Sequence, residues 1–235
     1  SACYKLRMAQ LSIVIPTLNV VPVLGPTLAA LAQMEGAGLV KELVVVDGGS
    51  TDGTREAVIE AGAVLIASEP GRGRQLQAGA AAARGDWILF LHADTELDPG
   101  WSGAIRSLMN TPESGDHAGY FRFALDDACS GARRLERLVT WRNRLLGLPY
   151  GDQGLVLSRA LYEKVGGFQD YPLMEDVDLV RRLGRRRLRL LDVAATTSAE
   201  RYRRDGYWHR PARNLFCLAL YYLGFSPHLI KRIYG

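Results

Sequence analysis

The chain has 235 residues, of which 48% are hydrophobic and 23% charged, and its formal net charge is +4. This composition excludes a disordered chain, and the length is enough for one substantial α/β domain with a small appendage. A diffuse nucleic-acid binder usually has a larger basic excess. We therefore expect no nucleic-acid partner and assign the surplus arginine to anionic ligands or membrane headgroups.

The cysteines and the apolar runs indicate the redox environment of the protein and whether it spans a membrane. Cys3, Cys129 and Cys217 are too far apart along the sequence to form a metal-ligand or disulfide pattern, which favours a reducing, cytoplasmic location. No apolar run reaches the roughly 18 residues that a membrane-spanning helix needs. We therefore expect no transmembrane segment.

The first hundred residues alternate short apolar strands with helical segments. Strands are predicted at Leu11–Ile15, Val40–Val46, Ala63–Ala67 and Trp87–Leu91, and helices at about Pro22–Met34, Gly53–Ala61 and Gln75–Arg84. This alternation predicts a mostly parallel sheet covered by helices on both faces, with right-handed crossovers. The second half is less regular, with strands predicted at Gly119–Leu125 and Gly154–Leu157 and helices at about Ala132–Leu146 and Met174–Gly184.

A polar, glycine-rich loop follows the second predicted strand and contains Asp47, Gly48, Gly49, Ser50 and Asp52. Glycines let a backbone approach a ligand closely, and short polar side chains supply hydrogen-bond donors and acceptors. Asp47 is a candidate contact to a base or ribose. A plain turn capped by Ser50 or Asp52 is an equal alternative. The loop has neither the G-x-G-x-x-G spacing of a dinucleotide site nor the Gly-Lys-Ser/Thr of a P-loop.

A second motif, His92-Ala93-Asp94, ends the buried strand Trp87–Leu91. Ligands of open α/β sheets bind at the carboxyl ends of the strands, and alternation places His92 and Asp94 on one side. Carboxylate and phosphate oxygens are the ligands that Mg²⁺ and Mn²⁺ prefer, so Asp94 with a diphosphate is a reasonable metal shell. Capping of a following helix by Asp94 is an equally supported alternative.

Three acids, Glu175, Asp176 and Asp178, crowd at the start of a predicted helix. Their simplest role is to complement the helix dipole. The alternative is a general base, because adjacent carboxylates raise one another's pKa. In the segment Gly-Arg-Gly-Arg-Gln, Arg74 is expected to reach a diphosphate, whereas Arg72 is interpreted as an exposed loop residue.

Taken in order, and together with Ile15-Pro-Thr-Leu-Asn19, these motifs resemble those of family 2 glycosyltransferases, which have a GT-A fold. The resemblance implies inverting transfer of a sugar from a nucleotide diphosphate, usually UDP-linked. It also implies one domain over residues 1–235. A nucleotide-sugar half would span about residues 10–115, an acceptor half about 116–200, and a helical tail about 201–235.

The resemblance assigns roles to individual residues. The nucleotide sugar would be contacted by Pro16, Thr17, Asn19, Asp47, Gly48, Gly49, Ser50, Asp52, Arg74, His92, Ala93 and Asp94. Asp94 would hold Mg²⁺ or Mn²⁺ on the diphosphate, and Asp176 would be the base beside Glu175. Val20 stands where the family often has Glu. His92 replaces the first acid of the Asp-x-Asp motif, which leaves Asp94 as the only carboxylate that this motif offers the ion.

A narrower branch is similar at four places, Gly71–Gly79, Leu91–Thr95, Tyr150–Gly154 and Thr197–Tyr202. This branch includes glycosyltransferases associated with arsenosugar biosynthesis and resembles the selenosugar synthases of selenoneine biosynthesis. The latter resemblance implies attack of selenophosphate on a UDP-N-acetylhexosamine to form a carbon–selenium bond. Glu200 stands where the branch often has Arg.

Several acceptors remain open at this point. The acceptor or the donor sugar is expected to be contacted by Asp152, Gln153, Arg201, Tyr202 and Arg204. Arginines beside an aromatic ring favour a small anionic acceptor such as selenophosphate. A carbohydrate, arsenosugar-precursor or lipid-linked hydroxyl is the first alternative. A non-catalytic nucleotide-sugar-binding protein is the second, and the acids of the motifs argue against it.

The segment Leu215–Phe225 is apolar on all sides and is followed by basic residues. A helix folded back onto the core is its simplest interpretation. A homodimer contact and a weak contact with a membrane surface are the alternatives.

Overall fold

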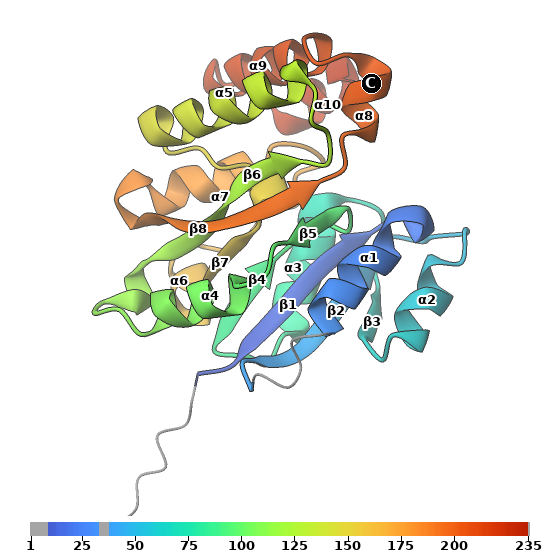
Figure 1. Cartoon of the computed structure of the whole chain (residues 1–235), viewed down its shortest axis with the longest axis vertical. Coiled ribbons are helices and arrows are strands. Elements are labelled where there is room, and N and C mark those ends of the chain that lie inside the picture. Colours follow the sequence, from blue (N-terminus) through green and yellow to red (C-terminus); the bar gives the residue numbers. More distant parts are fainter. Residues whose placement is uncertain (1–8, 33–37, 235) are drawn as a thin grey trace, which may run out of the picture.

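A computed structural model describes residues 9–32 and 38–234 (Figure 1). Within these residues, eight strands form one sheet in the order β3-β2-β1-β4-β7-β6-β8-β5. The strands are β1 (Leu11–Thr17), β2 (Val40–Asp47), β3 (Val64–Ala67), β4 (Trp87–Phe90), β5 (Thr95–Leu97), β6 (Ala118–Leu125), β7 (Leu155–Ser158) and β8 (Leu188–Thr197). Strands β3, β2, β1 and β4 run parallel, β7 is antiparallel to β4 and to β6, and β8 pairs with β6 in parallel and β5 antiparallel.

Helices cover both faces of this sheet, as the alternating pattern predicts. They are α1 (Val21–Ala32), α2 (Thr54–Glu60), α3 (Arg72–Ala82), α4 (Trp101–Met109), α5 (Ser130–Leu146), α6 (Arg159–Lys164), α7 (Glu175–Leu183), α8 (Glu200–Asp205), α9 (His209–Tyr222) and α10 (Pro227–Tyr234), with short 3-10 turns at Ser114–Asp116, Gly151–Gln153 and Arg185–Arg187. Cys3 and the predicted helix end at Met34 lie outside the described residues.

The structure confirms the predicted mixed α/β class and extends the sequence interpretation at three points. Helix α3 begins at Arg72, three residues before the predicted start at Gln75. The pairing of β8 with β5 and β6 was not evident from the sequence, because β8 is edge-exposed along much of its length and lacks a continuous apolar run. The tail folds into α8, α9 and α10 rather than a single helix.

Two apolar clusters sandwich the sheet. One lies between the sheet and helices α1 and α4, and contains the fully buried Leu24 and Trp101. The other lies on the opposite face under α3 and α7, and contains Leu76 and Leu179. Full burial of one such side chain contributes about 1.5–3 kcal/mol, so these clusters hold the strand ends in a fixed relation.

The helices at the end of the molecule away from β1–β3 pack on a third cluster. Cys217 and Leu218 of α9 and Ile230 of α10 are buried there against Val177 and Val180 of α7. One face of the predicted apolar tail is therefore core. Over residues 9–32 and 38–234, no helix is both long and apolar enough to cross a membrane.

Candidate active site

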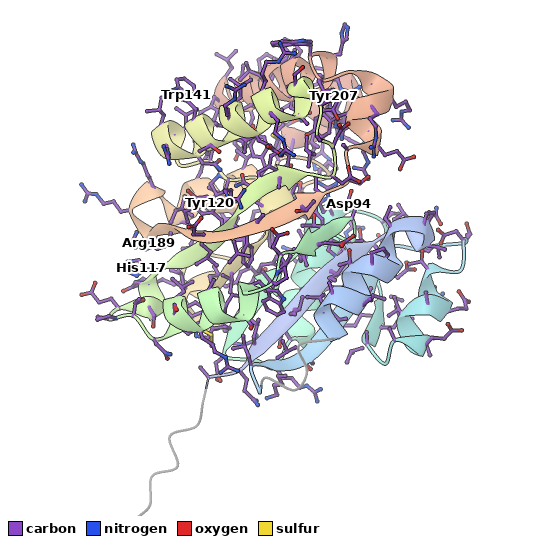
Figure 2. The ribbon with its side chains drawn as sticks, viewed as in Figure 1. Asp94, His117, Tyr120, Trp141, Arg189 and Tyr207 are labelled. Atoms are coloured by element: carbon purple, nitrogen blue, oxygen red, sulfur yellow. The ribbon has the colours of Figure 1, made fainter. Side chains whose placement is uncertain are left out.

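A cavity of about 610 Å³ opens at the carboxyl ends of β1 and β4, beside the start of α7. This volume lies in the range of small-molecule sites in proteins. Its charged and hydrogen-bonding lining includes Thr17, Arg72, Gln75, His92, Asp94, Asp152, Glu175, Asp176, Arg201, Tyr202, Arg210 and Lys231. Figure 2 shows Asp94 close to the end of β8, between the two halves of the protein. The motifs from both halves thus meet at one cavity.

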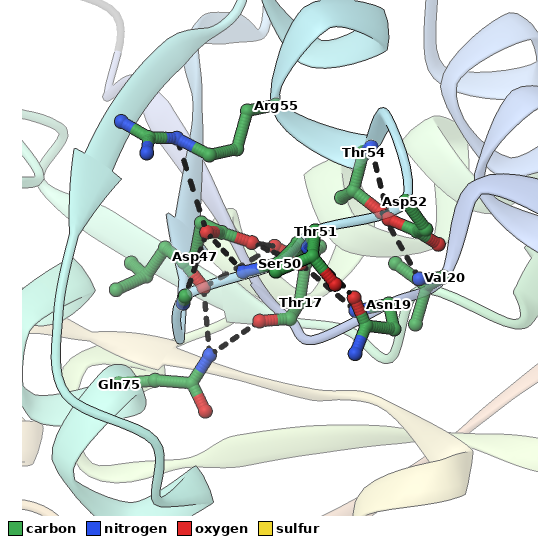
Figure 3. A network of polar contacts seen from close by, with 12 residues as sticks. Thr17, Asn19, Val20, Asp47, Ser50, Thr51, Asp52, Thr54, Arg55 and Gln75 are labelled. Atoms are coloured by element: carbon green, nitrogen blue, oxygen red, sulfur yellow. Dashed lines mark hydrogen bonds and ion pairs between the residues drawn. The ribbon is translucent and has the colours of Figure 1, made fainter.

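The loop after β2 is organised around the buried carboxylate of Asp47 (Figure 3). Asp47 accepts hydrogen bonds from the backbone N–H groups of Gly49 (3.0 Å) and Ser50 (2.9 Å) and from the hydroxyls of Thr17 and Ser50. Burial alone would raise the pKa of Asp47, but these hydrogen bonds outweigh it and lower the pKa below the usual value. The carboxylate therefore stays ionised and fixes the loop.

A second set of contacts ties this loop to the end of β1. The Asn19 side chain accepts from the backbone N–H of Thr51 at 2.9 Å, and its own backbone, at φ 52°, donates to Ser50. Asp52 accepts from the backbone N–H groups of Thr54 and Val21, at the starts of two helices. These contacts are those expected if Asp52 caps the turn, which is the alternative to a ligand contact.

Pro16, Thr17 and Ala93 line the cavity, whereas Asn19, Asp47, Gly48, Gly49, Ser50 and Asp52 do not and belong instead to the hydrogen-bonded loop that contacts Thr17 (Figure 3). Their direct contact with a nucleotide stays a prediction. Gln75, which the sequence interpretation did not select, lines the cavity and holds the end of β1 in place. Its amide donates to the carbonyls of Thr17 (2.7 Å) and Val46 (2.9 Å), and so joins β1 and β2 to α3.

The structure corrects the assignment of the two arginines at the start of α3. Arg74 does not line the cavity and pairs with Asp170 at 2.7 Å and with Glu69. Arg72 lines the cavity and lies 3.4 Å from Glu175. The register follows from Gly73, where an added Cβ would lie 2.3 Å from the carbonyl oxygen of Gln169, so only a glycine lets the helix start this close to the 169–171 segment.

Two further assignments are corrected in the second half. Gln153 is fully buried and does not line the cavity; its amide donates to the Phe121 carbonyl and accepts from Asn143. Its role is to anchor the 3-10 turn Gly151–Gln153 to β6. Arg204 is exposed, pairs with its neighbour Asp205 at 2.8 Å and does not line the cavity.

Arg201 and Tyr202 do line the cavity, and Arg201 lies 3.7 Å from the Asp94 carboxylate. The two residues meet because the end of β8 packs on the turn after β4. There the Thr197 hydroxyl and the Ser198 backbone N–H donate to the Asp94 carbonyl, at 3.2 and 3.3 Å. The segment Thr197–Tyr202 therefore packs directly on the segment Leu91–Thr95, which contains Asp94.

The remaining acids surround the cavity floor. Asp176 accepts a 2.7 Å hydrogen bond from the backbone N–H of Gly151. Burial raises the pKa of Glu175 to about 7, although Arg72 opposes the shift. Burial also raises the pKa of Asp152 to about 6, against the effect of Arg142, and Asp152 Oδ1 has no hydrogen-bond partner among the described residues. These two carboxyls are therefore able to exchange protons near neutral pH.

His92 differs from an acid in more than its charge. Burial lowers its pKa to about 4, and the neighbouring Arg72 adds to the effect, so the imidazole is neutral at pH 7. Asp94 is then the anionic ligand that this strand end offers to a cation. Among residues 9–32 and 38–234, no group of three or more His, Cys, Asp or Glu side chains is arranged to hold a metal ion. Asp94 could therefore hold a metal ion only together with oxygen atoms of a bound ligand, such as a diphosphate.

The fold and this site define a glycosyltransferase of the GT-A type. The chain belongs to glycosyl transferase family 2, whose sequence profile matches residues 12–146. The matched segment runs from β1 to the end of α5 and contains the Asp47 loop and Asp94. The predicted enzyme class and fold are therefore confirmed.

Sequence relatives include two kinds of mycobacterial enzyme. A glucosyl-3-phosphoglycerate synthase of Mycolicibacterium smegmatis is 37% identical over 97 residues, which are 37% of this chain and 31% of the relative. This chain thus matches about a third of the length of that synthase. A PGL/p-HBAD biosynthesis glycosyltransferase of Mycobacterium bovis is 32% identical over 178 residues, which are 71% of this chain and 66% of the relative.

Solved structures support the fold. The Mycobacterium tuberculosis glucosyl-3-phosphoglycerate synthase bound to Mn²⁺ and UDP-glucose aligns with a TM-score of 0.60 and 23% identity, over 81% of this chain and 71% of that one. The mannosyl-3-phosphoglycerate synthase of Rubrobacter xylanophilus aligns with a TM-score of 0.65 and 20% identity, over 92% and 75% of the two chains. The selenosugar branch indicated by the sequence stays a prediction.

Proposed function

We propose that this enzyme transfers a sugar, with inversion, from a UDP-sugar to a small anionic acceptor, and that selenophosphate is the foremost acceptor. The observation that carries the proposal is the set of cations around one cavity. Arg72 and Arg201 are placed near Asp94, and Arg210 and Lys231 line the wall formed by the tail helices. Oriented cations in a partly desolvated cavity bind phosphate groups well.

The donor would occupy the part of the cavity between β1 and Asp94. Thr17 lies there, held in place by Asp47 and Gln75. A divalent cation, Mg²⁺ or Mn²⁺, fits beside Asp94 because the single carboxylate is complemented by diphosphate oxygens. Such an ion would offset the charge that develops on departing UDP. The solved glucosyl-3-phosphoglycerate synthase holds Mn²⁺ together with UDP-glucose, which supports the choice of a divalent ion.

The protein's own residues would assist the transfer in three ways. Arg201 and Arg72 stabilise negative charge on the diphosphate as the bond to the anomeric carbon breaks. Tyr202 and Asp152 form the wall against which the sugar or the acceptor is positioned. Asp176, held in place by the backbone N–H of Gly151 at 2.7 Å, is the candidate base for a hydroxyl acceptor.

The acceptor determines whether a base is needed. Selenophosphate is already an anion, so its selenium would attack the anomeric carbon directly, the carbon–selenium bond forming as UDP leaves with the electron pair of the broken carbon–oxygen bond. A hydroxyl acceptor such as 3-phosphoglycerate must also lose a proton, which Asp176 would take. The relatives named as phosphoglycerate glycosyltransferases favour an anionic acceptor in general. A carbohydrate, arsenosugar-precursor or lipid-linked hydroxyl acceptor is the second candidate.

A mass-spectrometric acceptor screen tests the proposal. Purified protein with Mn²⁺ would be given UDP-N-acetylglucosamine or UDP-glucose, together with selenophosphate, 3-phosphoglycerate or no acceptor. We expect acceptor-dependent UDP release and a product of matching mass with an anionic acceptor. Absence of any UDP release above the enzyme-free rate with every pair would contradict the proposal.

Paired variants locate the effect in the cavity. Arg201→Gln should lower transfer at least about tenfold, because a charge-assisted contact to phosphate is lost. Arg204→Gln changes an equally basic neighbour that lies outside the cavity and should stay within about twofold of the unmodified protein. Equal losses in both variants would show that the effect is general rather than local.

A further inference from the structure

Helix α9 is apolar on two opposite faces. Its inner face buries Cys217 and Leu218 in the third core cluster. Its outer face carries apolar side chains at helical spacing, from the N-cap to the C-cap of the helix. We call these residues the α9 outer stripe: Trp208, Ala212, Leu215, Phe216, Ala219, Tyr222 and Leu223.

The α9 outer stripe is well exposed. Leu223 is 75% exposed, Leu215 65% and Trp208 64%. Contiguous apolar side chains on a protein surface mark contact sites, whereas isolated ones need no explanation. Since the opposite face of the same helix already forms core, folding of the described chain does not account for the stripe.

Further exposed apolar side chains lie at the same end of the molecule. Trp141 on α5 is 60% exposed, and Figure 2 shows it on the outer side of that helix. Leu229 and Ile233 on α10 are also exposed. The Arg134 guanidinium of α5 lies 5.3 Å from the ring centroid of Trp208, so α5 contacts the start of the α9 outer stripe.

Basic residues are numerous at the same end of the molecule as this apolar surface, although three of them, Arg201, Arg210 and Lys231, line the cavity. Residues 201–235 contain seven Lys or Arg and a single acid, Asp205, and residues 130–146 of α5 contain five Arg and a single Glu. The whole chain has 29 basic and 25 acidic residues, so the rest of the chain has an acidic excess. Figure 1 shows that α5, α8, α9 and α10 lie together at one end of the molecule. Positive charge is thus concentrated at the end that exposes the stripe.

We propose that the α9 outer stripe binds the surface of an anionic lipid bilayer, with α9 lying in the plane of the interface. Apolar side chains flanked by Lys and Arg are the composition that interfacial helices use, and each basic residue near an anionic membrane adds attraction. Pairing of the stripe with a second copy would bring two basic surfaces together, and the repulsion between like charges opposes it.

The bilayer-facing side and the cavity lie on opposite sides of the same helices. Arg210 and Asn214 of α9 and Lys231 and Tyr234 of α10 line the cavity. The outer stripe can therefore contact lipid while the cavity stays open to a soluble donor. This inference does not depend on which acceptor the enzyme uses.

Vesicle flotation together with tryptophan fluorescence tests the proposal. Vesicles of phosphatidylcholine containing about one-third phosphatidylglycerol are compared with phosphatidylcholine alone. Trp141 and Trp208 are exposed and Trp87 and Trp101 are buried, so the exposed pair reports on lipid contact without labelling. We expect flotation and a blue shift of emission with the anionic vesicles, both weakened by salt.

Two variants and a matched control identify the surface. Leu215→Glu with Leu223→Glu should reduce binding at least about tenfold, because charge replaces the apolar contact. Ile59→Glu alters a side chain of similar exposure, 63%, on α2 and should bind normally. Arg144→Glu with Arg232→Glu keeps the stripe and should weaken binding to anionic vesicles only. UDP release should be unchanged in all three variant proteins.

Three results would overturn the proposal: no flotation of the unmodified protein with anionic vesicles, equal binding to neutral vesicles, or normal binding of the Leu215/Leu223 variant. Light scattering, which measures the molar mass in solution, tests the alternative that a second copy of the chain covers the stripe. A dimer that dissociates in the Leu215/Leu223 variant, without vesicle binding by the unmodified protein, would assign the stripe to self-association instead.

Discussion

Replacing Gly73 with alanine tests the packing that places Arg72 in the cavity. Gly73 lies in the first turn of α3, where an added Cβ would be 2.3 Å from the Gln169 carbonyl oxygen and 2.8 Å from that of Tyr171. Both atoms belong to backbone, which does not rotate away as a side chain would. The first turn of α3 must therefore move by about 1 Å, and Arg72 moves with it.

The expected loss of stability follows from two opposing contributions. Overpacking of this kind costs about 1–3 kcal/mol, and the higher helix propensity of alanine returns about 0.5–1 kcal/mol. The net loss is therefore at most about 2.5 kcal/mol, which corresponds to a Tm decrease of up to about 10 °C for a chain of this size. Activity should fall further than stability, because a displacement of about 1 Å at a charge-stabilising group can cost on the order of a hundredfold.

Thermal melts and UDP-release rates measure the two effects separately. The matched control is Gly103→Ala in α4, where an added Cβ would meet no atom within 4 Å. That variant should gain about 0.5–1 kcal/mol and keep its activity. An unchanged Tm and rate in Gly73→Ala would refute the packing argument. A lowered Tm with an unchanged rate would refute the link between Gly73 and the position of Arg72.

Three further predictions follow from the site. Burial holds the pKa of Glu175 at about 7, above its ordinary value, so the contribution of its protonated form to stability is complete below about pH 4.5 and is lost as pH rises through 7. The Tm of the unmodified protein, relative to that of Glu175→Gln, should therefore fall from pH 5 to pH 8. A Tm difference between the two proteins that stays constant over this pH range would contradict the prediction. Calorimetry with Mn²⁺ and UDP should show binding weakened at least about tenfold in Asp94→Asn but not in Asp98→Asn, and chelation should abolish transfer. Gln153→Ala leaves buried partners unsatisfied and should cost about 3 kcal/mol in chemical denaturation, and a loss below about 0.5 kcal/mol would show that the turn does not depend on it.

Short-range patterns in the sequence determined the elements of the first half. The apolar runs of β2 and β4 predict buried strands wherever they occur, and polar residues directly after such a strand must lie at its carboxyl end. Asp94 could therefore be placed at the sheet edge without a structure. The Asp47 loop was found for the same reason, although the Asp47 carboxylate proved to be hydrogen-bonded by the loop itself and by Thr17 of β1.

Contacts between distant segments decided the rest, because local pattern contains no record of them. Arg72 and Arg74 are two residues apart, and only the docking of α3 against residues 169–171 determines which one faces the cavity. Arg201 reaches Asp94 across more than a hundred residues, through the packing of β8. Gln153 is likewise held in the interior by its hydrogen bond to Phe121 of β6, whereas its neighbour Asp152 lines the cavity.

The C-terminal tail separates most clearly what composition determines from what tertiary packing determines. Its composition determined that Leu215–Phe225 would be an apolar segment, too short to span a bilayer. Composition could not show that α9 buries only Cys217, Leu218 and their neighbours, since the buried face depends on where α7 and α10 lie. The tertiary structure alone therefore revealed an outer apolar face, because exposure is a property of the packed molecule and not of the residues.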